Sequence, residues 1–219
     1  MYRAVIFDLD GTLLDTLDDL SDAVNTALSA FQLPCRTRDE VKSFVGDGVA
    51  KLIERAVPEG CSSETTTDVL AKFKTHYAAH CRDKTAPYEG VLPLLSELRK
   101  QGIRTAIVSN KFDAAVKELS AYYFGDLIEV AVGEKEAEGI RKKPAPDTLL
   151  MAMRALSVTP DETLYVGDSD TDILTAQAAG TACVSVTWGF RDREFLVSHG
   201  AKMLIDVPHE LKSLLQSKG

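Results

Sequence analysis

Short apolar runs that alternate with helix-like segments constrain the fold of this chain more than any other feature of its sequence. The runs lack the polar alternation of a half-exposed sheet, which is typical of strands buried on both faces of a parallel sheet. The segments between them carry apolar residues at intervals of three and four, as amphipathic helices do. This pattern predicts an α/β fold with a doubly wound, Rossmann-like parallel sheet. The expected strands are residues 4–9, 103–108, 127–132, 163–166, 182–186 and 203–205, and the expected helices are residues 91–101, 113–122, 146–156, 172–179 and 208–216.

One long interval interrupts this alternation. Between the first two expected strands we find no convincing strand, and four stretches instead show the helical spacing of apolar side chains. We therefore expect a core formed by residues 1–15 and 85–219, with an α-helical cap, residues 16–84, inserted after the first strand. Residues 85–90, which include a proline and a glycine, are expected to form the return hinge.

Charge and hydropathy narrow the range of partners. The formal net charge is −8 and the pI is about 5.1, so nothing favours binding to nucleic acid or to an anionic membrane. No stretch approaches the roughly 20 apolar residues of a membrane span, and the first residues do not resemble a signal peptide. Cys35, Cys61, Cys81 and Cys183 lie far apart and are expected to be reduced thiols. We expect a cytoplasmic protein, either a monomer or a weak homodimer.

Two carboxylates follow the first expected strand. Asp8 and Asp10 are one residue apart, and Gly11 and Thr12 come next. Ligands of open α/β sheets bind at the carboxyl ends of strands, and side chains two apart on extended backbone point the same way. Two acids so close repel each other unless a cation or a shared proton compensates. The pattern predicts a functional site here, although a solvated turn would also explain it.

A second group of acids, Asp168, Asp170 and Asp172, follows the expected strand at residues 163–166. Some of these carboxylates would serve as the cap of the next helix, which is the alternative interpretation. Three acids in five residues exceed what one cap needs, and carboxylate oxygens suit Mg²⁺. Together with the acids of the first strand they predict a magnesium site.

The third motif is Ser109-Asn110-Lys111, directly after the expected strand at residues 103–108. A hydroxyl, an amide and a backbone turn at a strand end can donate hydrogen bonds to phosphate oxygens. Because Ser-Asn also marks helix caps, the motif taken alone leaves both interpretations open.

The fourth motif is a basic stretch at residues 141–147, in which Lys143 precedes Pro144. Prolines restrain the backbone here, so a neighbouring lysine can be held in place. A fixed ammonium would neutralise phosphate charge and hold Asp8 ionised. A solvated basic loop is the alternative.

The D-x-D-G-T pattern at residues 8–12, followed by the other motifs in this order, resembles the haloacid dehalogenase-like superfamily of phosphotransferases over nearly the whole chain. The resemblance implies that Asp8 is the nucleophile and Asp10 the general acid and base. It implies phosphoryl binding by Ser109, Asn110 and Lys143. It also implies a Mg²⁺ site at Asp8, Asp10 (through its backbone carbonyl), Asp168 and Asp172, with Asp170 left as a substitute ligand or a helix cap.

Within the expected cap, Gly46-Asp47-Gly48 predicts a tight exposed loop with available backbone N–H groups, or else a plain interhelical turn. This loop and the helix after it resemble the cap of phosphoglycolate phosphatases, which hydrolyse 2-phosphoglycolate. The late segment Thr187-Trp188-Gly189-Phe190 resembles the same enzymes. The likeness implies that Gly46 and Asp47 contact the substrate. Those enzymes commonly carry an amide at the position of Asp47, so Arg55, Lys51 and Lys111 are candidates to balance its charge.

We therefore expect a Mg²⁺-dependent phosphatase acting on a small phosphate ester. Asp8 would displace the leaving oxygen and form an aspartyl-phosphate, while Asp10 gives that oxygen a proton and later takes one from water. The alternatives are a β-phosphoglucomutase-type phosphotransferase, or a pyrophosphatase or sugar phosphatase of the same superfamily. A phospho-acceptor signalling module also pairs acids with a lysine, but it lacks the insertion and the D-x-D pattern.

Overall fold

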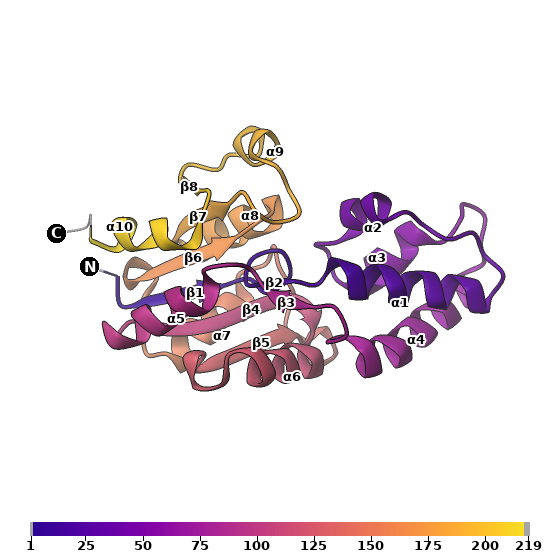
Figure 1. The fold of residues 1–219 in the computed structure, drawn as a ribbon, viewed down its shortest axis with the longest axis horizontal. Coiled ribbons are helices and arrows are strands. Elements are labelled where there is room, and N and C mark those ends of the chain that lie inside the picture. The colour runs from indigo at the N-terminus through magenta and orange to yellow at the C-terminus, as the bar shows by residue number, and fades with distance from the viewer. Residues whose placement is uncertain (1, 217–219) are drawn as a thin grey trace.

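The computed structural model describes residues 2–216 and contains a six-stranded parallel sheet (Figure 1). The strand order is β5-β4-β1-β6-β7-β8, and every neighbouring pair is parallel. Central β1 has β4 on one side and β6 on the other, which confirms the predicted doubly wound α/β fold. The strands are β1 (Ala4–Phe7), β4 (Arg104–Phe112), β5 (Val130–Glu134), β6 (Thr163–Gly167), β7 (Ala182–Val186) and β8 (Leu204–Ile205).

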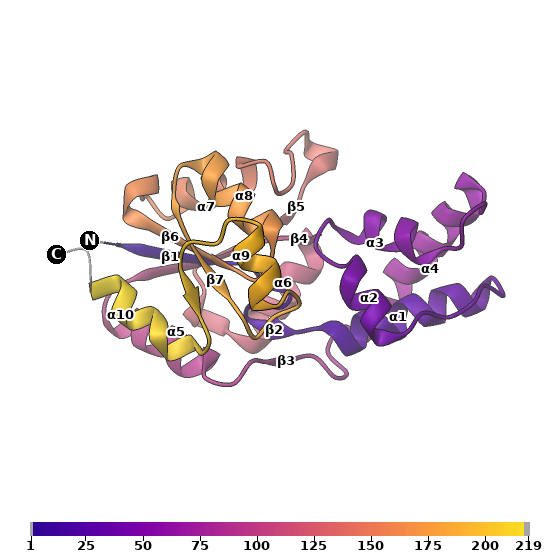
Figure 2. The same cartoon turned by 90° about the horizontal axis from the view of Figure 1, so that it is seen from above.

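Helices cover both faces of the sheet (Figure 2). They are α5 (Val91–Lys100), α6 (Asp113–Tyr123), α7 (Asp147–Ala155), α8 (Asp170–Ala179), α9 (Arg193–Ser198) and α10 (Leu211–Gln216), with short 3₁₀ helices η1 (Gly125–Leu127), η2 (Glu136–Glu138), η3 (Pro160–Glu162) and η4 (Pro208–Glu210). Val5 and Phe7 share a core with α5, α6 and α10, and Ala4 and Ile6 share one with α7 and α8. All four side chains of β1 are therefore buried, which explains a strand sequence without polar alternation.

Four helices follow the first strand and lie at the end of the molecule toward which the strands run (Figure 1). They are α1 (Leu17–Ala30), α2 (Arg38–Phe44), α3 (Val49–Ala56) and α4 (Ser63–His80), and each matches one of the stretches with helical spacing. Their starts are fixed locally: Thr37 and Glu40 form a capping box on α2, and the Ser62 hydroxyl accepts a hydrogen bond from the Thr65 N–H of α4. We refer to α1–α4 as the helical segment.

The chain enters and leaves the helical segment through two short antiparallel strands, β2 (Leu14–Asp15) and β3 (Ala86–Pro87). The expectation of no strand between residues 9 and 103 is wrong at these positions, because two-residue strands are too short to show a period. Asp19 of α1 reinforces the crossing. Its buried carboxylate accepts hydrogen bonds from the backbone N–H groups of Lys84, at 2.9 and 3.1 Å, and of Thr85, at 2.9 Å.

Two further differences from the expected elements lie in the core: the end of one strand and the presence of one short helix. β4 continues to Phe112, so Ser109, Asn110 and Lys111 belong to the end of the strand rather than to a loop after it. Helix α9 was not predicted, because its six residues carry too little apolar periodicity to stand out. The late strand and the terminal helix are confirmed as β8 and as η4 followed by α10.

The structure also bears on the predictions from hydropathy and cysteine content. In the part of the chain that the structure describes, no helix combines the length and the apolar character needed to cross a membrane. All four cysteines lie within this part and are free thiols, as expected.

Candidate active site

The candidate site lies at the carboxyl ends of three adjacent strands. Asp8 directly follows β1, Asp168 directly follows β6, and Lys111 lies near the end of β4. Because β1 is hydrogen-bonded to both β4 and β6, the end of each strand delivers its polar residues to one place. A cavity here is lined from the core by Asp8, Asp10, Ser109, Asn110, Lys111, Lys143, Asp168 and Ser169, and from the helical segment by Gly46 and Gly48.

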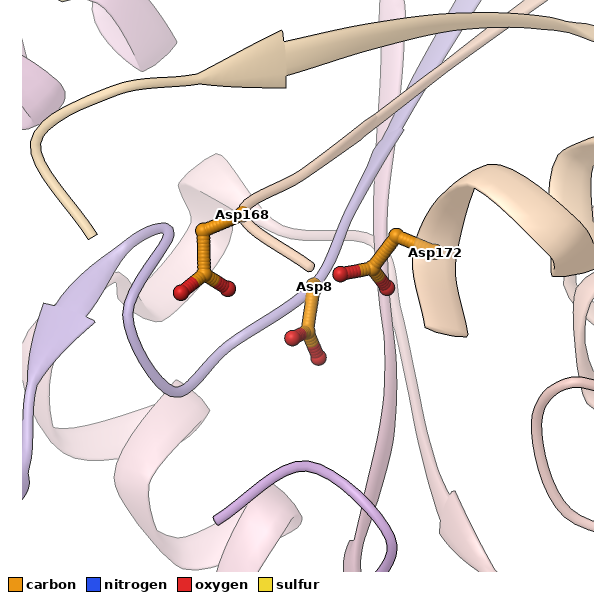
Figure 3. A group of neighbouring side chains, drawn as sticks. All are labelled: Asp8, Asp168 and Asp172. Carbon is orange, nitrogen blue, oxygen red and sulfur yellow. The ribbon is translucent and has the colours of Figure 1, made fainter. Parts of the chain in front are cut away.

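Asp8, Asp168 and Asp172 form a buried acidic cluster (Figure 3), in which one carboxylate oxygen from each lies within 4.8 Å of the others. The helical position of Asp172 turns its side chain toward Asp8, and Asp170 is not part of the cluster. The backbone packs tightly around these acids. A Cβ added to Gly11, whose φ is +84°, would lie 2.3 Å from an oxygen of Asp168. Glycine is therefore required beside this carboxylate.

Lys143 is enclosed among the acids. Its ammonium donates a hydrogen bond to Oδ1 of Asp172 at 2.7 Å and to the Tyr165 hydroxyl at 3.1 Å, and it lies 2.9 Å from Oδ1 of Asp8. Burial alone would lower the pKa of Lys143, but the carboxylates of Asp172 and Asp8 raise it above its ordinary value. Lys143 is thus a fixed cation next to Asp8, as predicted, but it does not by itself keep the pKa of Asp8 in its ordinary range.

The negative charges of the other two acids of the cluster, Asp8 and Asp168, are only partly balanced by neighbouring groups. Burial raises the pKa of Asp8 well above its usual range; Lys143 opposes this effect, and Asp172 and Asp168 add to it. Burial and repulsion from Asp172 raise the pKa of Asp168 to about 7, although the Phe190 N–H donates to it at 2.7 Å. Oδ1 of Asp8 is buried and has no hydrogen bond of acceptable geometry. A buried carboxylate oxygen of Asp8 without a hydrogen bond, next to the buried carboxylate of Asp168, fits a site for a divalent cation.

Asp172 has both carboxylate oxygens engaged by the protein. Oδ1 accepts from Lys143 and from the Tyr165 hydroxyl, while Oδ2 accepts from the backbone N–H of Ser169 at 3.1 Å and from its hydroxyl at 2.7 Å. These last two bonds close a capping box at the start of α8. Asp172 therefore combines the two roles that the sequence left open, a helix cap and a member of the acidic site.

Asp10 lies outside the acidic cluster and has its own cation. Its carboxylate accepts hydrogen bonds from the Lys111 ammonium at 2.8 and 3.1 Å and from the Thr16 hydroxyl at 2.7 Å. Burial would lower the pKa of Lys111, but the Asp10 carboxylate raises it above its ordinary value. The ring of Tyr77, from α4, lies 4.6 Å from the same ammonium. Asp10 is thus held in one orientation at the border between the core and the helical segment.

Asn110 connects three parts of the site. Its amide donates to the carbonyls of Gly46 and Lys143, both at 3.0 Å, and its Oδ1 accepts from the Lys143 N–H at 2.8 Å. Ser109 is buried beside it and accepts a hydrogen bond from the Lys111 N–H at 3.2 Å. Both predicted residues therefore lie in the cavity wall, and the side chain of Asn110 fixes the loop that carries Lys143.

The loop between α2 and α3 places Gly46 and Gly48 in the cavity wall. Asp47 in this loop pairs with Arg55 of α3 at 2.5 Å, and Arg55 also donates to the Phe44 carbonyl at 2.8 Å. Lys51 pairs with Glu54 instead. Of the cations considered from sequence, Arg55 is therefore the one that balances the charge of Asp47.

Sequence reasoning missed two residues of this region, Tyr77 and Arg191. Tyr77 is part of an ordinary helical apolar stripe, and nothing in the stripe distinguishes it from a core residue. Arg191 lines the cavity. It directly follows the segment Thr187-Trp188-Gly189-Phe190, whose likeness to phosphoglycolate phosphatases was the one available signal.

The chain is similar to known proteins both in sequence and in fold. The profile of the haloacid dehalogenase-like hydrolases matches residues 5–186. A phosphoglycolate phosphatase of Pseudomonas putida is 35% identical, covering 97% of this chain and 78% of that relative. One of Rhodospirillum rubrum is also 35% identical, covering 94% of this chain and 88% of that relative. A solved structure from Lactobacillus delbrueckii subsp. bulgaricus, assigned provisionally as a phosphoglycolate phosphatase, superimposes with a TM-score of 0.92 at 36% identity, covering 98% of each chain. The chain belongs to the haloacid dehalogenase-like hydrolase family.

Proposed function

We propose that this hydrolase is a Mg²⁺-dependent phosphatase that hydrolyses 2-phosphoglycolate, or a similar small phosphate ester, through an aspartyl-phosphate on Asp8. The observation that carries the proposal is the position of Asp8 at the end of the central strand, 2.9 Å from the fixed ammonium of Lys143 and within the acidic cluster. An anionic nucleophile can approach an anionic phosphate only where cations offset both charges.

Asp8 and Asp168 are the residues that we propose to hold Mg²⁺, with the backbone carbonyl of Asp10 as a further ligand. When bound, the ion would neutralise charge on the phosphoryl oxygens and on the two carboxylates. Asp172 would contribute indirectly, because its oxygens are already engaged by Lys143 and Ser169.

In the first chemical step an oxygen of Asp8 forms a bond to phosphorus as the bond to the ester oxygen breaks. Asp10 gives its proton to that departing oxygen. In the second step Asp10 takes a proton from water, whose oxygen attacks phosphorus and releases Asp8 and inorganic phosphate. Lys111 and Thr16 hold the carboxylate of Asp10 in one orientation, as is required of a group that exchanges protons at a fixed place. Ser109 and Lys143 bind the phosphoryl oxygens.

The helical segment acts in this proposal as a cap, residues 16–84, over a core of residues 1–15 and 85–219. Its loop at Gly46 to Gly48 forms part of the cavity wall, opposite Asp8 and Asp10, where a leaving group would lie. A closed cap excludes water and orients the substrate. The relatives named phosphoglycolate phosphatase support a small substrate, and we further propose a cytoplasmic location.

A substrate panel with Mg²⁺ tests this function. We expect kcat/KM for 2-phosphoglycolate to exceed that for sugar phosphates, pyrophosphate and nucleoside monophosphates, and we expect EDTA to abolish turnover. A clear preference for a sugar phosphate would refute the substrate and leave the mechanism standing. Full activity in EDTA would refute the metal dependence.

A further inference from the structure

Arg191 joins the core to the helical segment through backbone carbonyls. Its Nη1 donates to the Lys42 carbonyl at 3.1 Å, and its Nη2 donates to those of Ser43 at 3.3 Å and Val45 at 3.0 Å. These carbonyls lie in the last turn of α2 and just beyond it, where a helix leaves acceptors without partners of its own. The planar fork of a guanidinium is suited to bind several such oxygens at once.

The backbone that carries Arg191 is fixed to the acidic site. The Phe190 N–H donates to Asp168 at 2.7 Å, and the Trp188 indole donates to the Thr12 carbonyl at 3.0 Å. Gly189 packs so closely that a Cβ there would lie 2.4 Å from the Cβ of Asp168. Arg191 therefore extends from a segment whose position is set by one of the proposed metal ligands.

Arg191 acts electrostatically on Asp168 from a distance, where it opposes the raised pKa of that carboxyl group. Within residues 2–216 it forms no ion pair with a carboxylate, and its hydrogen bonds go to the carbonyls of α2 and the loop after it. The Phe195 ring lies 5.4 Å from its guanidinium carbon and supports the side chain on one side. The contact that the guanidinium makes is thus directed at the helical segment.

A second core side chain holds the same loop from the other side. The Asn110 amide donates to the Gly46 carbonyl at 3.0 Å. The carbonyls of residues 42, 43, 45 and 46 are therefore bound by two core residues that come from β4 and from the segment after β7. At and just after these attachments, the loop forms part of the wall of the cavity that is also lined by Asp8 and Asp10.

We propose that Arg191 is a positioning residue for the phosphatase reaction. It holds the α2–α3 loop over the site, so that the leaving group is oriented toward Asp10 and water is excluded during the first step. This inference rests on the proposed function. Arg191 acts in the first chemical step, which needs the closed cap, and it binds neither the phosphoryl group nor the metal.

The test compares two esters in Arg191→Ala, Arg191→Lys and the control Arg193→Ala. Arg193 is two residues away and pairs with Asp206 at 2.6 Å on the surface, outside the cavity wall. The first ester is 2-phosphoglycolate, or whichever alkyl phosphate the unsubstituted enzyme hydrolyses best. The second is p-nitrophenyl phosphate, whose leaving group departs without a proton from Asp10 and therefore does not need the loop in place.

For Arg191→Ala we expect kcat/KM for the alkyl phosphate to fall about 100-fold, since a small misplacement of the loop costs orientation. The loss for p-nitrophenyl phosphate should stay below about threefold, and Arg191→Lys should restore part of the alkyl activity because a lysine can reach a carbonyl but cannot span three. Arg193→Ala should behave as the unsubstituted enzyme does with both esters.

Two outcomes would overturn the proposal: an unchanged alkyl activity, or an equal loss on both esters, which would indicate damage to the phosphate or metal site. Circular dichroism checks folding, and if Arg191→Ala does not fold, the ratio of the two activities in Arg191→Lys decides in the same way. An unsubstituted enzyme that hydrolyses neither ester would instead refute the proposed function itself.

Discussion

Nζ of Lys143 lies 2.7 Å from Oδ1 of Asp172, and the two side chains are 2% and 0% exposed. The same ammonium lies 2.9 Å from Oδ1 of Asp8. Asp172 therefore fixes Lys143 in the position from which it can neutralise Asp8, the nucleophile that we propose. A buried cation held by two acids depends on both of them, because neither charge can turn to water.

The first prediction concerns this pair. Asp172→Asn should lower the free energy of unfolding by about 3 kcal/mol, because it removes one charge of a buried ion pair. Urea denaturation at neutral pH measures this change. The matched control is Asp170→Asn at the first position of α8, where the loss should stay below about 1 kcal/mol from the weaker interaction with the helix dipole. Equal losses of unfolding free energy in the two variants would contradict the role of Asp172 as the buried partner of Lys143.

The second prediction concerns pH in the absence of metal. The pKa of Asp168 is raised to about 7 from an ordinary value of 3.8, so the folded protein keeps a proton that the unfolded chain has already released. The free energy of unfolding in EDTA should therefore fall as the pH rises from about 4 to about 7. Urea denaturation across this range should give a shallower decline for Asp168→Asn. Identical slopes in both proteins would show that Asp168 does not cause the decline.

The third prediction concerns the nucleophile. Asp8→Asn should form no phosphoenzyme, because an amide cannot displace the leaving oxygen. Rapid acid quenching during turnover, followed by intact-protein mass spectrometry, should detect a phosphoryl adduct in the unsubstituted enzyme and in Asp170→Asn but not in Asp8→Asn. Near-native turnover by Asp8→Asn, with deamidation excluded in the same spectra, would remove Asp8 from this role.

The fourth prediction concerns charge in the cap loop. Asp47→Asn removes a negative charge near an anionic substrate, so KM for 2-phosphoglycolate should fall about threefold. Arg55→Ala leaves Asp47 without its partner and should raise KM by about tenfold or less, since the pair is partly exposed. In the double variant Asp47→Asn/Arg55→Ala, most of the increase in KM caused by Arg55→Ala should disappear. Steady-state kinetics at low and at high salt measure both effects, which should shrink at high salt; salt-independent changes would argue for a steric cause.

The fifth prediction concerns the crossing between the core and the helical segment. Asp19→Ala leaves the buried N–H group of Thr85 and the partly buried N–H group of Lys84 without their acceptor, and it should cost about 2–3 kcal/mol of unfolding free energy. Asp22→Ala breaks an exposed pair with Lys84 and should cost less than about 1 kcal/mol. Urea denaturation of both variants provides the comparison. A loss at Asp22 as large as that at Asp19 would show that the buried hydrogen bonds are not what stabilises the crossing.

The elements that could be predicted from the sequence are those in which apolar residues recur with a regular period. The buried strands and the four helices of the helical segment repeat an apolar pattern over several residues, and each of them is present in the structure. The bounds are less accurate, because β5 begins at Val130 rather than at residue 127 and β4 ends at Phe112 rather than at residue 108. β2 and β3 have two residues each and show no period, so their pairing depends on tertiary contacts alone.

The site divides in a similar way. Asp8 and Asp168 directly follow neighbouring strands, so topology alone brings them together. Lys143 lies in a loop well after β5, the edge strand, and its position depends on hydrogen bonds to the Asn110 side chain. Whether Asp170 or Asp172 joins the acidic cluster depends on the residue at which α8 begins, because that residue decides which side chain turns inward. The partners of Asp10 and Asp47 required the packing of the helical segment on the core. The role of Arg191 could not be predicted for a different reason. Its hydrogen-bond acceptors are backbone carbonyls, which every residue possesses and which leave no pattern in a sequence.

That last feature bears on how substrate preference could diversify. Arg191 and Asn110 recognise the helical segment by carbonyl oxygens at residues 42, 43, 45 and 46, so these contacts do not depend on which side chains the segment carries. Asp15 and Ala86 pair across β2 and β3, which brings the two junctions side by side. Substitutions that change the side chains of residues 42–46 would therefore leave these attachments in place, so a new pocket lining could be presented to an unaltered catalytic sheet.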